Sequence, residues 1–509
     1  MYTRRLKGGR MVCLCMPRHL HRRDFLRAGS VGIAFSLAGC PGDGGTDGTD
    51  DGTVTGTRAD ETTPSSRRVG TGDFGFRGGI LDGYDGQRPT ALALGPDGAV
   101  YVAEQGGLVR RLAVTREGPG SFTVDQSRAI EALQTLPNHN DDGSVVDIGG
   151  RQVTGLTAAG TSERPRLYVT SSDPRRRVPE GTAPAESVDT NSGVLSRLTL
   201  GDGVEHAQLV RGLPRSRNGH ATNGLAVAPD ESTAYVAQGG HTNMGAPAER
   251  FVGLPEYALS GAILAVDLTR LDGTNGVAYD LPTLAGTETP FGGQGGANMA
   301  RLTDDGPVTM YAPGFRNPYD VCLTAGGGLY TVDNGPNRGW GGPPVSEDGH
   351  CTHQSNELDS REHPDGLHDI TDADGYYGGH PNPTRAAPDA VGFTEAVPAA
   401  DSRQCEYLRP GVEDDALVTF RPSTNGLTEY TADAFDGRLR GDLLAASYDG
   451  AVHRVTKQDG DVVGQSSLFE SRGCLDVVAA GPDHAHPGTV WTANRGPGVI
   501  GVAEPVVKD

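Results

Sequence analysis

The chain has 509 residues, enough for roughly two or three ordinary domains or one large β-domain. Its 76 glycines and 34 prolines make turns abundant, and only 36% of its residues are hydrophobic. The formal net charge of −21 excludes a nucleic-acid partner, because a phosphate backbone requires a basic surface.

The basic residues are almost all arginine. Of the 44 lysines and arginines, only Lys7, Lys457 and Lys508 are lysine. An acidic surface with so little lysine is typical of a protein from a very salty environment, where dense carboxylates hold water and salt screens their repulsion. We therefore interpret the acidity as adaptation to salt and not as a site for a cationic ligand.

The N-terminus carries a targeting signal. Residues 21–27 (HRRDFLR) match a twin-arginine motif, and the apolar run 28–38 after it is too short to span a bilayer. The run ends at Leu37-Ala38-Gly39-Cys40, which resembles a lipobox. We expect export by the twin-arginine route and a lipid on Cys40 that anchors the protein to the extracytoplasmic face of the cell membrane. Secretion with Cys40 unmodified is the alternative.

A polar tether follows the signal. Residues 41–72 lack aromatic residues and are rich in Gly, Asp and Thr, so they cannot bury enough apolar surface to offset the entropy of ordering. The expected organisation is a signal with lipobox at 1–39, a disordered tether at 40–72 and a single domain at 73–509.

One unit recurs from residue 73 onward. It consists of an apolar strand, a Gly/Pro/Asp turn and a second strand that ends in polar residues. The turn favours a hairpin because proline presets φ and glycine readily adopts a positive φ. The six copies span residues 91–106, 156–173, 225–240, 321–335, 439–455 and 477–495, and the fifth is offset within the unit.

These repeats predict an all-β fold, a six-bladed β-propeller with long loop insertions near residues 240–310 and 335–430. Each small sheet of a propeller can bury its faces only against its neighbours, which explains a recurring strand pair. The polar strand ends should then converge at one end of the central channel. They are Glu104, Asp173, Gln238–His241, Asp333–Asn337 and Asn494.

Four cysteines remain in the expected domain, at positions 322, 351, 405 and 474. In an exported domain they predict two disulfides with three possible connectivities, of which Cys351–Cys405 with Cys322–Cys474 is preferred. The alternative is a zinc site, because His350, Cys351 and His353 lie close in sequence. The lack of a CxxC motif favours the disulfides.

Two stretches carry candidate catalytic side chains. His220 lies just before the third strand pair, where an imidazole could act as a general base, although a structural histidine is the simpler interpretation. Arg316-Asn317 offers a fixed fork of donors for carboxylate or quinone oxygens. The alternative is a buried arginine that caps carbonyl groups within a blade.

Two further stretches could bind a ligand. Asp333 to Asn337 (DNGPN) gathers hard oxygen donors that suit calcium, with Asn356–Asp359 as a source of further oxygens, but a plain Asx turn explains it equally well. Residues 376–383 (YYGGHPNP) could line a small-molecule cleft or form an ordinary packed loop.

In this order, the motifs resemble those of the glucose/sorbosone dehydrogenase family. The resemblance covers roughly residues 75–505, and the residues that carry it are Gly219-His220, Gly314–Pro318, Gly327–Tyr330, Gly335–Asn337 and Gly339-Trp340. Soluble members of that family are six-bladed propellers that use pyrroloquinoline quinone (PQQ) and calcium.

The resemblance implies a role for each matching residue. His220 would take the proton of the sugar's anomeric hydroxyl as hydride passes to the quinone. Arg316 and Asn317 would contact quinone and substrate, and Trp340 and Arg472 would belong to the cofactor site. Asp333, Gly335 and Pro336 would hold the calcium, the last two through their carbonyl groups.

The sequence departs from the family at two places. Gly239-Gly240 stands where the family has Gly-Asp, so the acid that orients the histidine is missing there. Asp449 stands near the position of a quinone-binding lysine, and its charge would repel a tricarboxylate. The stretch Pro255–Leu264 also suggests a divergent branch.

Two functional hypotheses follow. The first is an exported, membrane-anchored oxidoreductase that resembles PQQ-dependent sugar dehydrogenases and acts on an aldose or another aldehyde. The second is a non-catalytic propeller that binds carbohydrate or another surface component, with structural calcium. In both, contact with the membrane is made only through the lipid at Cys40.

Overall fold

The computed structural model describes residues 67–71, 73–179, 181–271, 276–347, 350–355, 361–391, 400–458 and 460–506. The twin-arginine signal, Cys40 and the expected calcium ligands at 356–359 lie outside the described residues. Across the described ranges, no helix is both long enough and apolar enough to span a membrane.

Six sheets of four or five strands confirm the predicted six-bladed β-propeller. Blade 1 consists of β3 (Pro89–Leu94), β4 (Val100–Glu104), β5 (Val109–Gly118) and β6 (Ser121–Ile130). Blade 2 consists of β9 (Gln152–Gly160), β10 (Pro165–Ser172), β11 (Gly193–Leu200), β12 (Val204–Leu213) and β16 (Gly276–Val277). Blade 3 consists of β13 (Thr222–Val227), β14 (Thr233–Gln238), β15 (Ala262–Asp267) and β17 (Val308–Pro313).

The second half of the ring is built in the same way. Blade 4 consists of β18 (Pro318–Leu323), β19 (Leu329–Asp333), β22 (Asp365–Asp369) and β23 (Val418–Phe420). Blade 5 consists of β24 (Thr424–Glu429), β25 (Leu443–Ser447), β26 (Ala451–Gln458) and β27 (Asp461–Glu470). Blade 6 consists of β1 (Arg67–Val69), β2 (Phe76–Ile80), β28 (Cys474–Ala479), β29 (Val490–Asn494) and β30 (Val499–Pro505).

Short elements fill the connections between blades. Two small hairpins are β7 (Asn138–His139) with β8 (Val145–Val146) and β20 (Pro344–Glu347) with β21 (His350–Ser355). In the described part of the chain the only α-helix is α1 (Pro383–Ala386). The 3₁₀ turns are Ala132–Thr135, Pro184–Glu186, Glu249–Phe251, Leu268–Arg270, Gln294–Gly296, Pro388–Val391, Ser402–Cys405 and Ala434–Gly437.

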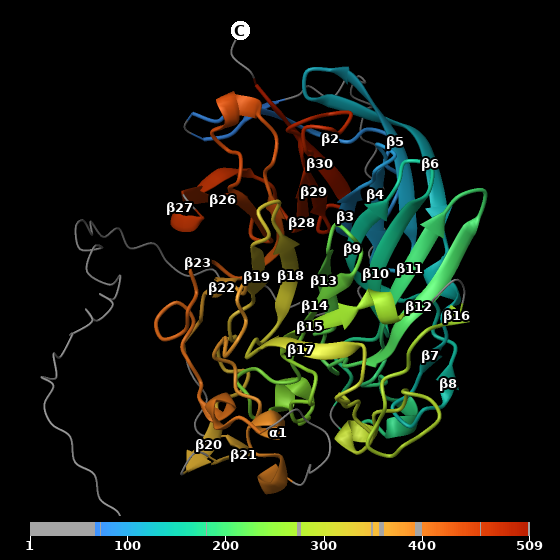
Figure 1. Ribbon diagram of the computed structural model, residues 1–509, viewed down its shortest axis with the longest axis vertical. Coiled ribbons are helices and arrows are strands. Elements are labelled where there is room, and N and C mark those ends of the chain that lie inside the picture. The colour runs from blue at the N-terminus through green and yellow to red at the C-terminus, as the bar shows by residue number, and fades with distance from the viewer. Residues whose placement is uncertain are drawn as a thin grey trace, which may run out of the picture. The chain divides into compact units, whose positions relative to one another are not determined.

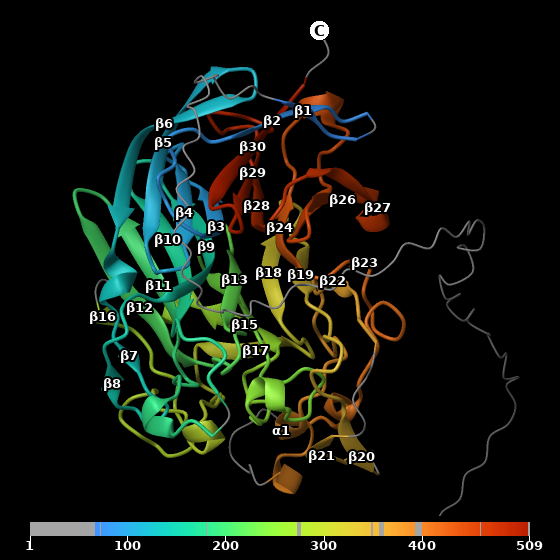
Figure 2. The same ribbon diagram turned by 180° about the vertical axis from the view of Figure 1, so that it is seen from behind.

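The ring closes through blade 6. The innermost strands β3, β9, β13, β18, β24 and β28 contact one another in that order, and β28 contacts β3. The blue strand β2 pairs with the red strand β30, so both ends of the propeller sequence meet in one sheet (Figures 1 and 2). This pairing leaves no open sheet edge between the first and last repeats.

The repeated turn chemistry explains why the hairpins form. In blade 1 the turn between β3 and β4 places Gly98 at a φ of 74°. Asp97 accepts hydrogen bonds from the Tyr101 hydroxyl at 3.0 Å and from Arg111 Nε at 2.7 Å, which ties the turn to two strands. Tyr101 and its counterparts Tyr168, Tyr330 and Trp491 are buried, whereas Tyr235, the counterpart in blade 3, is only partly buried. Each large aromatic side chain therefore fills the space between neighbouring blades.

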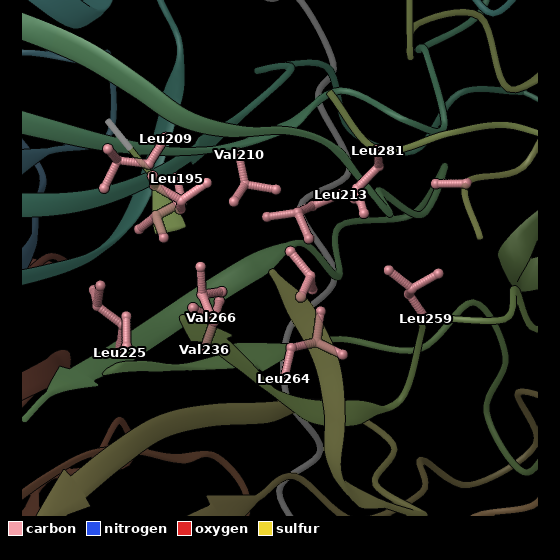
Figure 3. Close-up of a cluster of buried hydrophobic side chains, with 14 of the residues drawn as sticks. Leu195, Leu209, Val210, Leu213, Leu225, Val236, Leu259, Leu264, Val266 and Leu281 are labelled. Carbon is pink, nitrogen blue, oxygen red and sulfur yellow. The ribbon is translucent and has the colours of Figure 1, made fainter. Parts of the chain in front are cut away.

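Apolar side chains pack between adjacent blades and not inside a single layer. The cluster in Figure 3 joins blade 2, through Leu195 on β11 and Leu209 on β12, to blade 3, through Val236 on β14 and Leu264 on β15. Such a cluster forms only when two blades meet, so the propeller is stabilised by pairs of neighbouring repeats.

Two sequence boundaries differ from the structure. The fifth copy, 439–455, covers the middle strands β25 and β26, while the inner strand of blade 5 is Thr424–Glu429. It begins Thr-Asn-Gly-Leu as β13 does, but it continues with Thr428-Glu429 where β13 has Ala226-Val227, so the apolar run that marks the repeat is broken. The strand Arg67–Val69 lies within the expected tether and pairs with β2, so ordered structure begins before residue 73.

The disulfide prediction is half right. Cys351 and Cys405 are bonded, with their Cα atoms 5.3 Å apart, so Cys351 is not a zinc ligand. Cys322 and Cys474 are free and buried, and the predicted bond between them is wrong. They lie on the inner strands of blades 4 and 6 and pack into different apolar clusters.

Candidate functional site

Two adjoining cavities open where the inner strands begin. One has a volume of about 260 Å³ and is lined by His220, Arg316, Asn317 and Trp340, among others. The second, of about 220 Å³, is lined by residues of blades 2 to 6 and shares Asn317 with the first. We call the two together the mouth cavity. Of the predicted polar strand ends, the segment from Asp333 to Asn337 supplies several of its lining residues.

Hydrogen bonds with Ser216 and Arg215 hold the backbone around His220. Ser216 Oγ accepts hydrogen bonds from the N–H groups of Gly219 at 3.1 Å and His220 at 3.0 Å. The buried Arg215 donates to the His220 carbonyl oxygen at 3.1 Å. The Phe251 ring contacts the imidazole edge-on, with centroids 4.9 Å apart. The run Arg215-Ser216 therefore positions the histidine that the sequence singled out.

The imidazole of His220 has one defined tautomer. Its Nδ1 atom lies 2.9 Å from the carbonyl oxygen of Gly240. A carbonyl oxygen can only accept, so Nδ1 carries the proton and Nε2 keeps its lone pair. Burial, and next the charge of Arg316, lowers the pKa of His220 well below its usual range. At neutral pH His220 is therefore an uncharged imidazole that can accept a proton.

Arg316 is buried next to this histidine and is only partly satisfied. Its Nε donates to Asn243 Oδ1 at 3.1 Å and its Nη1 to the Asn334 carbonyl oxygen at 3.4 Å. Its Nη2 is buried and has no hydrogen-bond partner among the described residues. Burial lowers the pKa of Arg316 to about 10, so the guanidinium stays charged at neutral pH. Arg316 thus contributes to the lining of the cavity a charged guanidinium whose Nη2 is unpaired among the described residues.

Asn317 belongs to a ladder of amides that links three blades. Its Nδ2 donates to Asn334 Oδ1 at 3.0 Å, and its Oδ1 accepts from Asn223 Nδ2 at 3.0 Å. Asn334 continues the ladder to the Thr424 carbonyl oxygen at 2.7 Å. The ladder joins the starts of β13, β18 and β24. It fixes the orientation of the Asn317 side-chain amide at the mouth cavity.

Asp333 clamps the backbone of the same segment. Its Oδ2 accepts from Arg316 N–H at 3.0 Å and its Oδ1 from Asn317 N–H at 2.7 Å. Burial raises its pKa to about 6. Over the described residues no group of three or more His, Cys, Asp or Glu is arranged to hold a metal ion. Asp333 therefore positions the backbone of Arg316 and Asn317.

The remaining predicted cofactor residues lie at different distances from the cavity. Trp340 lines it and stacks under Arg250, whose guanidinium carbon is 5.5 Å from the ring centroid. Arg472 is exposed and is not one of the lining residues, whereas Arg495 of the same blade is. Asp449 is also exposed and outside the lining set. The repulsion of an anionic ligand expected from Asp449 is therefore not supported.

Three arginines that the sequence motifs missed surround the cavity: Arg176, Arg177 and Arg495. Arg176 Nε donates to the neutral amide oxygen of Gln152 at 2.9 Å, and Arg495 donates to that of Gln105. The Arg176 side chain is exposed, and desolvation by the surrounding protein, followed by the charges of Arg495 and Arg177, lowers its pKa. Because these three arginines carry like charges and line one cavity, they would attract a ligand with several negative charges.

The aromatic loop 376–383 packs behind the site. The Tyr376 ring stacks on Phe315 at 5.9 Å, and its hydroxyl lies 2.7 Å from His368 Nδ1. A space of only about 10 Å³ separates this loop from Arg316, which suits a single water. Of the two interpretations left open, the packed loop is the one the structure supports.

No family model matches the chain, and no curated protein matches it. Among solved structures, it is similar to a calcium structure of a Trichoderma reesei carbohydrate-active enzyme of family AA12 (14% identity, 88% of this chain and 100% of that chain, TM-score 0.49). It is also similar to the holo PQQ domain of pyranose dehydrogenase from Coprinopsis cinerea (12%, 87% and 98%, 0.49). A third is the PQQ-bound aldose sugar dehydrogenase of Streptomyces coelicolor (14%, 87% and 100%, 0.43). With similarities this low, the fold assignment rests on the chain's own sheet order.

Proposed function

We propose that this chain is a divergent member of the glucose/sorbosone dehydrogenase family. It would be an exported oxidoreductase, anchored by a lipid at Cys40, that oxidises an aldose or another aldehyde with PQQ and calcium. The observation that supports this proposal is a single cavity lined by His220, Arg316, Asn317 and Trp340, the matching residues of three separate motifs.

His220 serves as the general base in this proposal. Its Nδ1–H donates to the Gly240 carbonyl oxygen, which leaves a lone pair on Nε2. Nε2 is therefore the atom that removes the proton from the sugar's anomeric hydroxyl. Its lowered pKa keeps it unprotonated before that step. A neutral base needs no prior deprotonation at neutral pH.

Arg316 stabilises negative charge that develops during the reaction. Its buried guanidinium remains charged, and one of its nitrogen atoms has no partner in the part of the chain that the structure describes. Because the guanidinium is buried, such a cation acts more strongly than it would in water. The Asp333 clamp and the Asn317 ladder hold this charge in place, so little reorganisation is needed.

The residues of the mouth cavity fit a quinone that carries several carboxylates. Arg176, Arg177, Arg316 and Arg495 supply the positive charge that the missing lysine would have given. The half-buried Trp340 offers an aromatic face to a planar ring. When bound, the quinone supplies the acceptor for hydride. The Gly335 and Pro336 carbonyl groups are hard oxygen ligands of the kind that calcium prefers.

The test is reconstitution of the exported protein with PQQ and Ca²⁺ in high salt. Quinone binding is followed by absorbance, and dye reduction is assayed over a panel of aldoses. We expect binding and turnover, a loss of about 10²- to 10⁴-fold in kcat for His220→Gln, and no change for the control His453→Gln on β26. Absence of both binding and turnover would overturn the proposal, and sugar binding without quinone binding would favour the non-catalytic propeller.

A further inference from the structure

A buried carboxylate lies behind His220, in the stretch Pro255–Leu264 that marks the chain as divergent. Glu256 is fully buried. Its oxygens accept hydrogen bonds from His241 N–H (2.8 Å), Thr242 N–H (2.9 Å), Thr242 Oγ1 (2.6 Å), His380 Nε2 (2.9 Å) and Ser260 Oγ. Burial raises the pKa of Glu256, but the hydrogen bond and charge of His380 outweigh it and hold the pKa well below its usual range. Glu256 is therefore ionised.

One peptide group connects this carboxylate to the base. The Gly240–His241 peptide donates its N–H to Glu256 Oε2 at 2.8 Å and accepts His220 Nδ1–H on its carbonyl oxygen at 2.9 Å. A negative charge at the N–H end of a peptide polarises it and makes its carbonyl oxygen a stronger acceptor. The order of contacts is thus carboxylate, peptide, imidazole.

The packing explains why no acid stands at position 240. A Cβ on Gly240 would lie 2.8 Å from Glu256 Oε1 and 2.8 Å from the Arg316 carbonyl oxygen. A Cβ on Gly239 would lie 2.6 Å from Asn317 Oδ1 and 2.9 Å from His220 Cβ. Both values are far below normal contact. The space that a side chain at 240 would need is therefore taken by the Glu256 carboxylate.

We propose that Glu256 is the positioning residue for His220 and takes the place of the acid missing from Gly239-Gly240 by acting through the Gly240–His241 peptide. It holds the proton on Nδ1, leaves the Nε2 lone pair toward the cavity and strengthens His220 as a base. The inference rests on the proposed role of His220. Of the other charged or titratable groups, Arg316 and His380 have the largest effects on the His220 ring, and Arg215 contacts only its carbonyl oxygen.

The first test needs no catalysis. In the cofactor-free protein, with histidines labelled with ¹⁵N, the His220 ring is observed by NMR in wild type and in Glu256→Gln. We expect the Nδ1–H tautomer in wild type, and in the variant a weaker Nδ1–H hydrogen bond and a lower His220 pKa, because a stabilising negative charge is lost. An Nε2–H tautomer in wild type would overturn the proposal even if the variant did not fold.

The second test is kinetic and uses a matched control. Glu256→Gln should lower kcat roughly three- to tenfold with KM nearly unchanged, and should move the acid limb of the pH profile to lower pH. Thr242→Val also removes a hydrogen bond to Glu256, but it leaves the 240–241 peptide intact, so its pH profile should match wild type. If the pH profile and the His220 NMR signal were both unchanged in Glu256→Gln, the positioning role of Glu256 would be refuted. The dehydrogenase proposal would still stand. A wild type without turnover would refute the dehydrogenase proposal. The NMR experiment would still show whether Glu256 positions His220.

Discussion

Substitution of Gly240 by alanine probes how tightly the site is built. The added methyl group would lie 2.8 Å from both the Arg316 carbonyl oxygen and Glu256 Oε1. The carbonyl cannot retreat easily, because it accepts the Gly240 N–H at 2.8 Å. Gly240 is not among the glycines with positive φ, so alanine meets no backbone penalty there and the cost is steric.

The magnitude follows from two opposing effects. Overpacking of a filled interior costs about 1–3 kcal/mol, whereas replacing glycine by alanine lowers the entropy of the unfolded chain and recovers about 0.4–1 kcal/mol. We expect the free energy of unfolding of Gly240→Ala to fall by about 1–2 kcal/mol. Turnover should fall too, because the methyl group displaces the peptide that holds His220.

The assay is urea unfolding at constant salt, followed by the fluorescence of the fully buried Trp491 and of Trp340. Gly464→Ala on β27 is the control, because its Cβ would meet nothing within 4 Å. With no steric cost, it should be more stable than wild type by about 0.4–1 kcal/mol, through the entropy of the unfolded chain alone. If Gly240→Ala unfolded at the same urea concentration as wild type, the space at position 240 would not be filled as described.

Further predictions concern the disulfide, pH and charge. Replacing Cys351 and Cys405 by serine removes a disulfide between residues 54 positions apart in the sequence. This should lower the free energy of unfolding by about 4 kcal/mol in urea titrations. Because the pKa of His220 is lowered, kcat/KM should stay level from pH 8 to about 6.5 and fall only at more acidic pH, where the imidazole gains a proton; a midpoint at its ordinary pKa of about 6.5 would contradict this. Arg176→Gln or Arg495→Gln should weaken PQQ binding about tenfold in absorbance titrations, whereas Arg472→Gln should not.

The strand pairs could be predicted because their signals are local. A Pro-Asp-Gly turn and alternating apolar residues, as around Tyr101, determine a hairpin over some fifteen residues, and repetition then indicates a propeller. Motif resemblance likewise found His220, Arg316 and Trp340, which line one cavity. It did not find Asp333 as a backbone clamp, since that role requires the three-dimensional contact with Arg316.

The remaining site residues depend on contacts between distant segments. Arg176 and Arg495 come from blades 2 and 6, and they meet only after the ring closes. Glu256 reaches His220 through a peptide of another loop, so no spacing in the sequence reveals it. The wrong Cys322–Cys474 pairing has the same origin, because cysteine number alone does not show that the two lie in separate clusters.

Titration with PQQ shows whether the mouth cavity is a quinone site, as the proposed function requires. The exported protein would be titrated with PQQ in the presence of Ca²⁺ and high salt, with absorbance as the readout and Arg316→Gln as the comparison. We expect saturable binding with one quinone per chain, weakened at least tenfold in the variant, because Arg316 lines the cavity with a charged guanidinium. Absence of saturable binding to wild type, or equal binding to the variant, would contradict it.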